Sequence, residues 1–199
     1  MIIKPTPDDD KQYQEFVLAL GGFMVEFANL ESFFLTHLIG ALSEDAVLAD
    51  CVGEQVPSLK DRLNLVKALA KAPKKALPAA LIGRIIGLAN EVSRLSEFRN
   101  DVAHNAPREI YLASKDAEGG RVFFVGTPKR ASKRKPGPAF VDDPLEVAEI
   151  IKEWHYSVAA LHENSKVAAG LRTRMFEITI DLWELRNGQP GPEISQGPA

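Results

Sequence analysis

Hydrophobic residues recur at alternating intervals of four and three over the first part of the chain. Between about Gln12 and Leu42 they form one line along a helix surface: Phe16, Leu20, Phe23, Phe27, Leu30, Phe34, His37 and Ala41. This spacing is typical of an α-helix with one packed face, because side chains three and four residues apart lie on the same side. Glu31 interrupts a second apolar line beside the first. We therefore predict a long first helix that carries a carboxylate at an inward position.

The same spacing returns in two later segments. The core side of the first is formed by Leu59, Leu63, Val66 and Ala70, and Ser58 stands at the position of its cap. The second follows Pro78 and has the line Leu81, Ile85, Leu88, Val92, Leu95, Arg99 and Val102, before Pro107 ends the pattern. Arg99 therefore occupies a position where an apolar residue is expected.

The periodicity changes after Pro107. The segments Glu109–Ser114 and Arg121–Gly126 are rich in β-branched and aromatic residues and are joined by a turn with Gly119-Gly120, which predicts a β-hairpin. Residues 139–141 are a candidate third strand. Asp143-Pro144 is a strong helix start. It predicts a helix as far as Ala168, a break at Gly170 and a last helix over about 171–185.

These elements predict a mainly all-α protein. We expect an antiparallel helical bundle of one domain, residues 1–187, with a β-hairpin insertion at about 108–142. Residues 188–199 are rich in glycine and proline and are expected to form a flexible C-terminal tail.

Composition narrows the class of protein. The chain has 199 residues, of which 45% are hydrophobic and 26% charged, as in ordinary globular domains. A single cysteine, Cys51, excludes an internal disulfide framework and favours a reducing, cytoplasmic compartment. No signal peptide is evident, and the apolar run Phe16–Val25 has about half the length of a membrane span, so we expect no membrane partner. Four scattered histidines indicate no zinc site, and no cofactor is expected.

Arg99 and His104 are the strongest candidates for chemistry. An arginine can stabilise the charge on a phosphate, and a histidine can transfer protons. Five residues at 100° each place the two side chains about 140° apart on an ideal helix. They can face one phosphate only if the helix distorts near Asn100 or if a second subunit contributes. Asn100 and Asp101 compete for backbone hydrogen bonds and favour a helix ending there. Asp101 and Glu31 are candidate supporting residues of the site.

The string Arg99-Asn100-Asp101-Val102-Ala103-His104 resembles the signature of the HEPN superfamily: an arginine, a polar residue and a histidine after a short spacer. The resemblance implies a helical bundle that dimerises so that two motifs line one cleft. Many members are metal-independent RNA endonucleases that act in defence or as toxins, and others are interaction modules. The resemblance makes Arg99 and His104 the active pair and Asn100 their polar support. Some toxin members carry a tyrosine two residues after the histidine, where this chain has Ala106.

Two other features bear on this hypothesis. Glu31 is expected either to pair with Arg99 in the cleft or to lie in solvent at its rim. Residues 121–138 hold six basic residues and no acidic one, although the chain has a net charge of −3. This stretch is either a nucleic-acid contact or a solvated loop. Its candidate contacts are Lys129, Arg130, Lys133, Arg134 and Lys135.

Three readings follow from the sequence. The first is a dimeric ribonuclease of HEPN type. The second is a non-catalytic module of the same fold that binds nucleotide, RNA or protein and uses Arg99 and His104 as a buried polar clasp. The third is a dimeric structural protein whose first and last helices form the functional surface. The RNA target and any antitoxin or other neutralising partner are not indicated by these residues.

Overall fold

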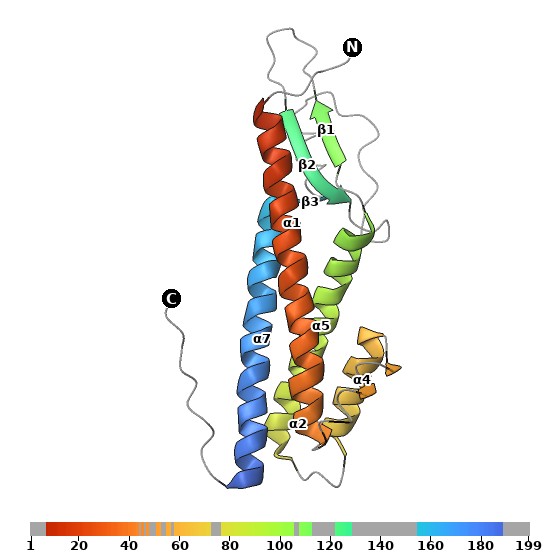
Figure 1. Ribbon diagram of the computed structural model, residues 1–199, viewed down its shortest axis with the longest axis vertical. Coiled ribbons are helices and arrows are strands. Elements are labelled where there is room, and N and C mark those ends of the chain that lie inside the picture. The colour runs from red at the N-terminus through yellow and green to blue at the C-terminus, as the bar shows by residue number, and fades with distance from the viewer. Residues whose placement is uncertain are drawn as a thin grey trace. The chain divides into compact units, whose positions relative to one another are not determined.

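The structure is a computed structural model that describes residues 7–43, 45, 47, 51–52, 55–56, 58–72, 77–105, 108–112, 122–128 and 155–188 (Figure 1). It is mainly helical with a small antiparallel sheet, which confirms the predicted fold class. By packing, the chain falls into two compact units, each formed by two separate stretches. We call Met1–Val25 with Ser96–Lys166 the first unit, and Glu26–Leu95 with Val167–Ala199 the second unit.

The predicted first helix is present and begins earlier than expected. Helix α1 (Pro7–Phe33) continues into the π-helical segment η1 (Phe34–Ile39) and then into α2 (Gly40–Ser43). Phe16, Phe23, Phe27 and Leu30 of the predicted line are buried, and Leu20 is half-buried. From Leu38 in η1 onward the buried positions are Leu38, Ile39 and Leu42 rather than His37 and Ala41. The shift has a physical reason. A π-helical turn contains one more residue than an α-helical turn, so the buried face advances along the sequence.

This long helical stretch is also more apolar than the run Phe16–Val25 suggested. Within Asp10–Ser43 an 18-residue window has a mean hydropathy of 1.4, which by length and composition is enough to cross a membrane. The core helix of a soluble protein, which is mostly buried, and a signal sequence near the N-terminus pass the same test. Here only 28% of the window is buried inside the protein. In the part of the chain that the structure describes, α1 therefore has exposed apolar side chains, including Leu18 and Val25.

The sheet belongs to the first unit. Strands β1 (Arg108–Leu112) and β2 (Val122–Pro128) pair antiparallel from Arg108↔Gly126 to Leu112↔Val122, which confirms the predicted hairpin. Strand β3 (His155–Tyr156) pairs with β2 through Thr127↔Tyr156. His155 and Tyr156 were predicted to be helical, and that prediction is wrong. The candidate strand 139–141 and the helix start at Asp143-Pro144 lie outside the described residues.

Helix α7 (Val158–Asn187) begins at a cap that the sequence analysis missed. The backbone N–H of Leu161 donates to the Ser157 carbonyl at 3.1 Å, and that of Ala160 lies 3.4 Å from the Ser157 hydroxyl. The predicted break at Gly170 is also wrong, because α7 passes through that residue as regular helix. A single glycine costs a helix only about 1 kcal/mol, and the apolar line Leu161, Ala168, Leu171, Met175 continues across it.

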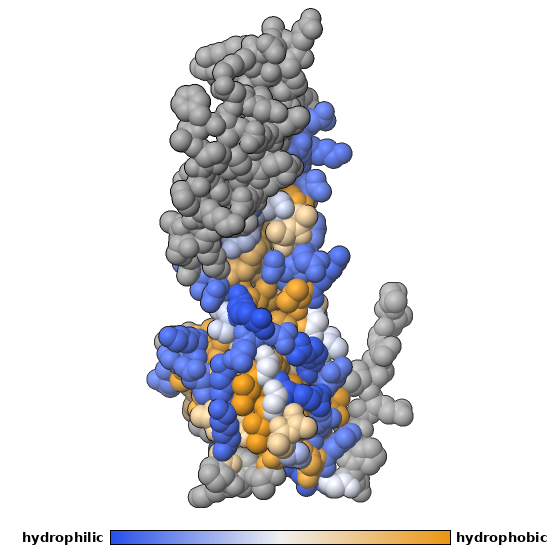
Figure 2. Space-filling view, turned by 180° about the vertical axis from the view of Figure 1, so that it is seen from behind, coloured by the Kyte–Doolittle hydropathy of each residue, from blue (hydrophilic) through white to orange (hydrophobic). Residues whose placement is uncertain are grey.

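The second unit is a helical bundle. It combines α4 (Leu59–Ala70) with the first part of α5 (Ala79–His104), the end of α1 and most of α7. Ion pairs link these helices: Arg62–Glu31 at 3.3 Å, Arg172–Glu26 at 3.1 Å, Arg174–Glu91 at 2.7 Å and Arg84–Asp181. Figure 2 shows hydrophobic side chains (orange) reaching the surface among hydrophilic ones (blue) on the described part of one face. The core of the unit includes Leu63, Val66, Ile85, Leu88, Val92, Met175 and Leu182.

Candidate functional site

The last turns of α5 carry the predicted motif and belong to the first unit. Helix α5 remains regular as far as His104, so it lacks the distortion near Asn100 that was one of the two alternatives from the sequence. The side chain of Asn105 caps the C-terminal end of the helix, because its amide donates to the carbonyl of Asp101 at 2.6 Å. This bond satisfies one of the carbonyls that every helix end leaves without a helical partner. On a regular helix Arg99 and His104 point in directions about 140° apart. Within one chain the two side chains therefore leave the helix on different sides.

Arg99 and Asn100 are in direct contact, as their proposed roles require. The Nη1 atom of Arg99 donates to the Oδ1 atom of Asn100 at 3.1 Å. Both residues are half-buried, and the Nε atom of Arg99 is buried. The guanidinium is thus held against the helix while part of it reaches the surface.

His104 lies in the last turn of α5 and is exposed to solvent. The imidazole is therefore accessible to a ligand. Residues that follow Asn105 directly, including Ala106 and Pro107, lie outside the described part of the chain. The polar clasp in the second reading required both Arg99 and His104 to be buried. Only the arginine meets that requirement, and only in part.

Asp101 has a different environment from its neighbours. It is fully buried, and its Oδ2 atom accepts a hydrogen bond from the Tyr156 hydroxyl at 3.0 Å. The Tyr156 ring packs edge-on against Phe98, with ring centroids 4.4 Å apart, and Phe98 packs edge-on against Phe23 at 5.0 Å. Asp101 was predicted as a supporting residue of the motif. In the structure it ties β3 to the end of α5, beneath the exposed residues of the motif.

Tyr156 is the residue of this region that the sequence analysis missed. It stands 55 positions after Asp101. Helical periodicity assigned it to a helix, and no local motif marks it as the partner of a carboxylate. A pairing at this separation becomes evident only when β3 is placed beside β2.

Glu31 has its own partner in the second unit. Its carboxylate lies 3.3 Å from Arg62 Nη1, and the Arg62 side chain is only 11% exposed. The Nε atom of Arg62 also donates to the carbonyl of Val56. The inward position predicted for Glu31 is thus explained by an arginine of α4, whereas the sequence analysis expected Arg99 or solvent.

The predicted nucleic-acid contacts lie outside the described residues. They are Lys129, Arg130, Lys133, Arg134 and Lys135. Among the residues that the structure describes, no group of three or more histidine, cysteine, aspartate or glutamate side chains could hold a metal ion.

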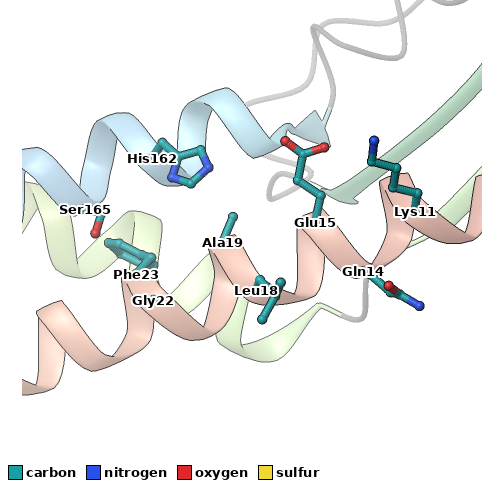
Figure 3. Close-up of a pocket in the computed structure, with 9 residues that line it drawn as sticks. All are labelled: Lys11, Gln14, Glu15, Leu18, Ala19, Gly22, Phe23, His162 and Ser165. Atoms are coloured by element: carbon teal, nitrogen blue, oxygen red, sulfur yellow. The ribbon is translucent and has the colours of Figure 1, made fainter. Parts of the chain in front are cut away.

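A groove in the first unit was not predicted from the sequence. It has a volume of about 620 Å³ and lies between α1 and the start of α7 (Figure 3). Figure 3 shows His162 and Ser165 of α7 facing α1, with Lys11 and Glu15 projecting from α1. Phe23 lines the groove and also contacts Phe98, the residue before Arg99. The remaining lining residues are Gln14, Leu18, Ala19 and Gly22.

Comparisons with known proteins give no relative for this chain: no protein family, curated protein or solved structure matches it.

Proposed function

We propose that this protein is a metal-independent RNA endonuclease of HEPN type that acts as a dimer. Arg99 and His104 are its reacting pair, and Asn100 positions the arginine. The proposal rests on the motif in the sequence and on one observation about its surroundings. Arg99, Asn100 and His104 reach the surface on the closing turns of α5, while Asp101 between them is buried and bonded to Tyr156. A rigid support beneath exposed reagents is the arrangement that catalytic groups need.

The reaction is an internal transesterification of RNA. The 2′-oxygen forms a bond to the adjacent phosphorus, and the bond from phosphorus to the 5′-oxygen breaks. The 2′-hydroxyl loses its proton, and the departing 5′-oxygen gains one. His104 carries out proton transfer in this exchange, and Arg99 stabilises the charge that develops on the phosphorane oxygens. No metal ion is required, because the RNA supplies its own nucleophile.

The dimer is part of this proposal for a geometric reason. Arg99 and His104 point about 140° apart on a regular helix. A second copy of the chain can supply the complementary side chain to the same phosphate. The cleft between two copies then contains an arginine from one and a histidine from the other.

The ends of the products test the reaction directly. Cleavage by the 2′-hydroxyl leaves a 2′,3′-cyclic phosphate on one fragment and a 5′-hydroxyl on the other, which mass spectrometry identifies. A matched RNA with 2′-deoxy sugars should remain intact. Cleavage of the deoxy substrate, or products with a 5′-phosphate, would show that another reaction occurs.

The second candidate is a non-catalytic RNA-binding or protein-interaction module. It is favoured by the hydrogen bond that holds Arg99 on Asn100 and by the buried Nε atom, which resemble a structural contact. Under this reading RNA binds without being cut. Arg99→Ala then lowers the midpoint of thermal unfolding, and there is no cleavage to lose. Fluorescence anisotropy with labelled RNA, run beside the product analysis, separates the two candidates.

A further inference from the structure

The proposed reaction moves two protons, one on each side of the phosphorus. The attacking 2′-oxygen and the departing 5′-oxygen lie roughly in line through the phosphorus atom. One proton therefore leaves on one side, and the other is delivered on the opposite side. A single imidazole cannot accept the first and donate the second in the same step. The reaction needs a second titratable group beside His104.

Four titratable side chains lie on the closing turns of α5 in the first unit: Glu97, Arg99, Asp101 and His104. Arg99 remains charged and has no acceptor for a proton. Asp101 is fully buried, and its Oδ2 atom accepts a hydrogen bond from the Tyr156 hydroxyl. Glu97 is exposed, as His104 is. Of the described groups on these turns, Glu97 is therefore the carboxylate that a bound RNA can reach.

Glu97 and His104 lie on the same face of α5. They are seven residues apart, which on a regular helix separates them by about 20° around the axis and about 10 Å along it. Asn100 lies between them along this face, about 60° from Glu97 and about 40° from His104. Its Oδ1 atom accepts a hydrogen bond from Arg99, and its amide nitrogen can donate to a phosphate oxygen. Two turns of one helix thus present a carboxylate, an amide and an imidazole to the same side.

We propose that Glu97 is the general base of the ribonuclease reaction and that His104 of the same chain is its general acid. The Glu97 carboxylate takes the proton of the 2′-hydroxyl as the 2′-oxygen forms its bond to phosphorus. The bond from phosphorus to the 5′-oxygen breaks, and the His104 imidazolium gives its proton to that oxygen. Proton exchange with water then returns both side chains to their starting forms. This inference rests on the proposed function and adds a residue outside the Arg99–His104 motif.

An RNA with sulfur in place of the departing 5′-oxygen separates the two roles, because a thiolate leaves without a proton. On ordinary RNA, Glu97→Gln and His104→Ala should each lose about 10²-fold in rate. On the sulfur substrate, His104→Ala should regain at least about tenfold, whereas Glu97→Gln should stay slow. Glu163→Gln, at an exposed glutamate of α7, is the matched control and should cleave both substrates like the wild type.

Mixed dimers test whether the base and the acid belong to the same chain. Glu97→Gln mixed with His104→Ala leaves no chain that has both groups, so cleavage should not recover. Glu97→Gln mixed with Arg99→Ala is the positive control. Here the Arg99→Ala chain keeps Glu97 and His104, and its partner supplies Arg99, so part of the activity should return.

Glu97→Asp tests whether the carboxylate itself reacts. It keeps the acid on a shorter side chain and should cleave ordinary RNA faster than Glu97→Gln does. Equal losses in the two folded variants, as judged by circular dichroism, would assign Glu97 a structural role and contradict the inference. The aspartate variant also decides the matter if Glu97→Gln fails to fold, because a general base should then retain measurable cleavage in Glu97→Asp.

Three results would overturn this inference alone, provided that the wild type cleaves RNA through Arg99 and His104. They are a wild-type rate in Glu97→Gln, recovery of Glu97→Gln on the sulfur substrate, and recovery of cleavage when Glu97→Gln is mixed with His104→Ala. A wild type that leaves RNA intact would overturn the proposed function, and this inference with it.

Discussion

Asp101 and its neighbours in α5 show how one turn of helix serves two purposes. Asp101 is fully buried and bonded to Tyr156, whereas Arg99 and Asn100 are half-buried and bonded to each other. A buried carboxylate is stable only with a good hydrogen-bond donor, because burial removes its water. The hydroxyl of Tyr156 is such a donor. It therefore contributes to the stability of the unit and to the position of the motif.

Tyr156→Phe should lower the stability of the protein. The substitution keeps the ring on Phe98 and removes only the hydroxyl, so Asp101 loses a donor in the interior. Losing one partner of a buried polar group costs about 1–3 kcal/mol. Thermal unfolding followed by circular dichroism should show a lower midpoint. Tyr13→Phe, at a tyrosine that is 37% exposed, is the matched control. Equal midpoints for the two variants would show that the Asp101 contact contributes nothing.

Arg99→Lys separates the shape of the guanidinium from its charge. Lysine keeps the positive charge but cannot donate two parallel hydrogen bonds to a phosphate. We expect the rate of RNA cleavage to fall by about 10²-fold while circular dichroism shows a folded protein, as for the loss of one oxyanion donor. Arg94→Lys, at an exposed arginine of the same helix, should cleave like the wild type. Full activity in Arg99→Lys would mean that charge alone is required.

Gly170 was predicted to end a helix, but α7 continues through it. Its effect on stability can be tested by substitution. Gly170 lies within the helix, without a left-handed backbone and with no atom within 4 Å of an added Cβ. Gly170→Ala should therefore stabilise the protein by about 0.5–1 kcal/mol. Gly188 has a φ of +60° and follows the last residue of α7, so Gly188→Ala should be destabilising. Chemical denaturation of both variants measures the two effects, and changes of the same sign would contradict this account.

The ion pair between α5 and α7 in the second unit makes stability depend on pH. The hydrogen bond from Arg174 lowers the pKa of Glu91, and the same contact raises the pKa of Arg174. A carboxylate whose pKa is lower in the folded state stabilises the fold above its unfolded value and loses that effect as the pH falls through its folded value. The arginine titrates above any pH used for folding studies. The pH dependence therefore comes from Glu91.

Glu91→Gln should be less stable than the wild type near pH 7. This difference in the free energy of unfolding should shrink as the solution becomes acidic. The pair is largely exposed, so its contribution near pH 7 is at most about 1 kcal/mol after screening by solvent. Denaturation curves from neutral pH down to below the usual glutamate range, about 4.3, measure the difference. Glu163→Gln, at an exposed glutamate of α7, should follow the wild type throughout. A difference that stays constant with pH would exclude this role for Glu91.

The helices show which parts of the fold the sequence could predict. The presence of α1, α4 and α5 followed from apolar spacing, because one buried face leaves a regular pattern. The start of α7 did not, since the strong signal at Asp143-Pro144 outweighed a modest cap at Ser157. The shift at η1 was also missed, because a π-helical turn depends on packing rather than on a local motif. Arg99, Asn100 and His104 were proposed as site residues from the sequence alone, whereas Tyr156 and the groove became evident only in the fold.

At the scale of the whole protein, the question is whether one chain or two form the proposed site at Arg99 and His104. On a regular α5 the side chains of Arg99 and His104 leave the helix on different sides. We therefore proposed that a second copy of the chain completes the site. The ribonuclease proposal therefore predicts that activity per chain rises with protein concentration. It should reach a plateau where sedimentation shows the dimer to be complete.

Mixing two inactive variants tests the shared cleft. If each phosphate meets Arg99 of one copy and His104 of the other, Arg99→Ala mixed with His104→Ala forms some dimers with one intact cleft. We expect partial recovery of cleavage on mixing and none in either variant alone. Failure to recover, with exchange of chains confirmed by mass spectrometry, would place both reacting groups in one chain or exclude them.

The central claim is that Arg99 and His104 cleave RNA without a metal. It is tested most directly by incubating a labelled RNA of mixed sequence with the wild type, Arg99→Ala and His104→Ala in excess EDTA. We predict that the wild type cleaves the RNA as well with the chelator as without it. Each variant should lose at least about 10²-fold in rate while keeping its circular dichroism spectrum. Loss of wild-type cleavage in EDTA, or wild-type rates in either variant, would contradict the claim.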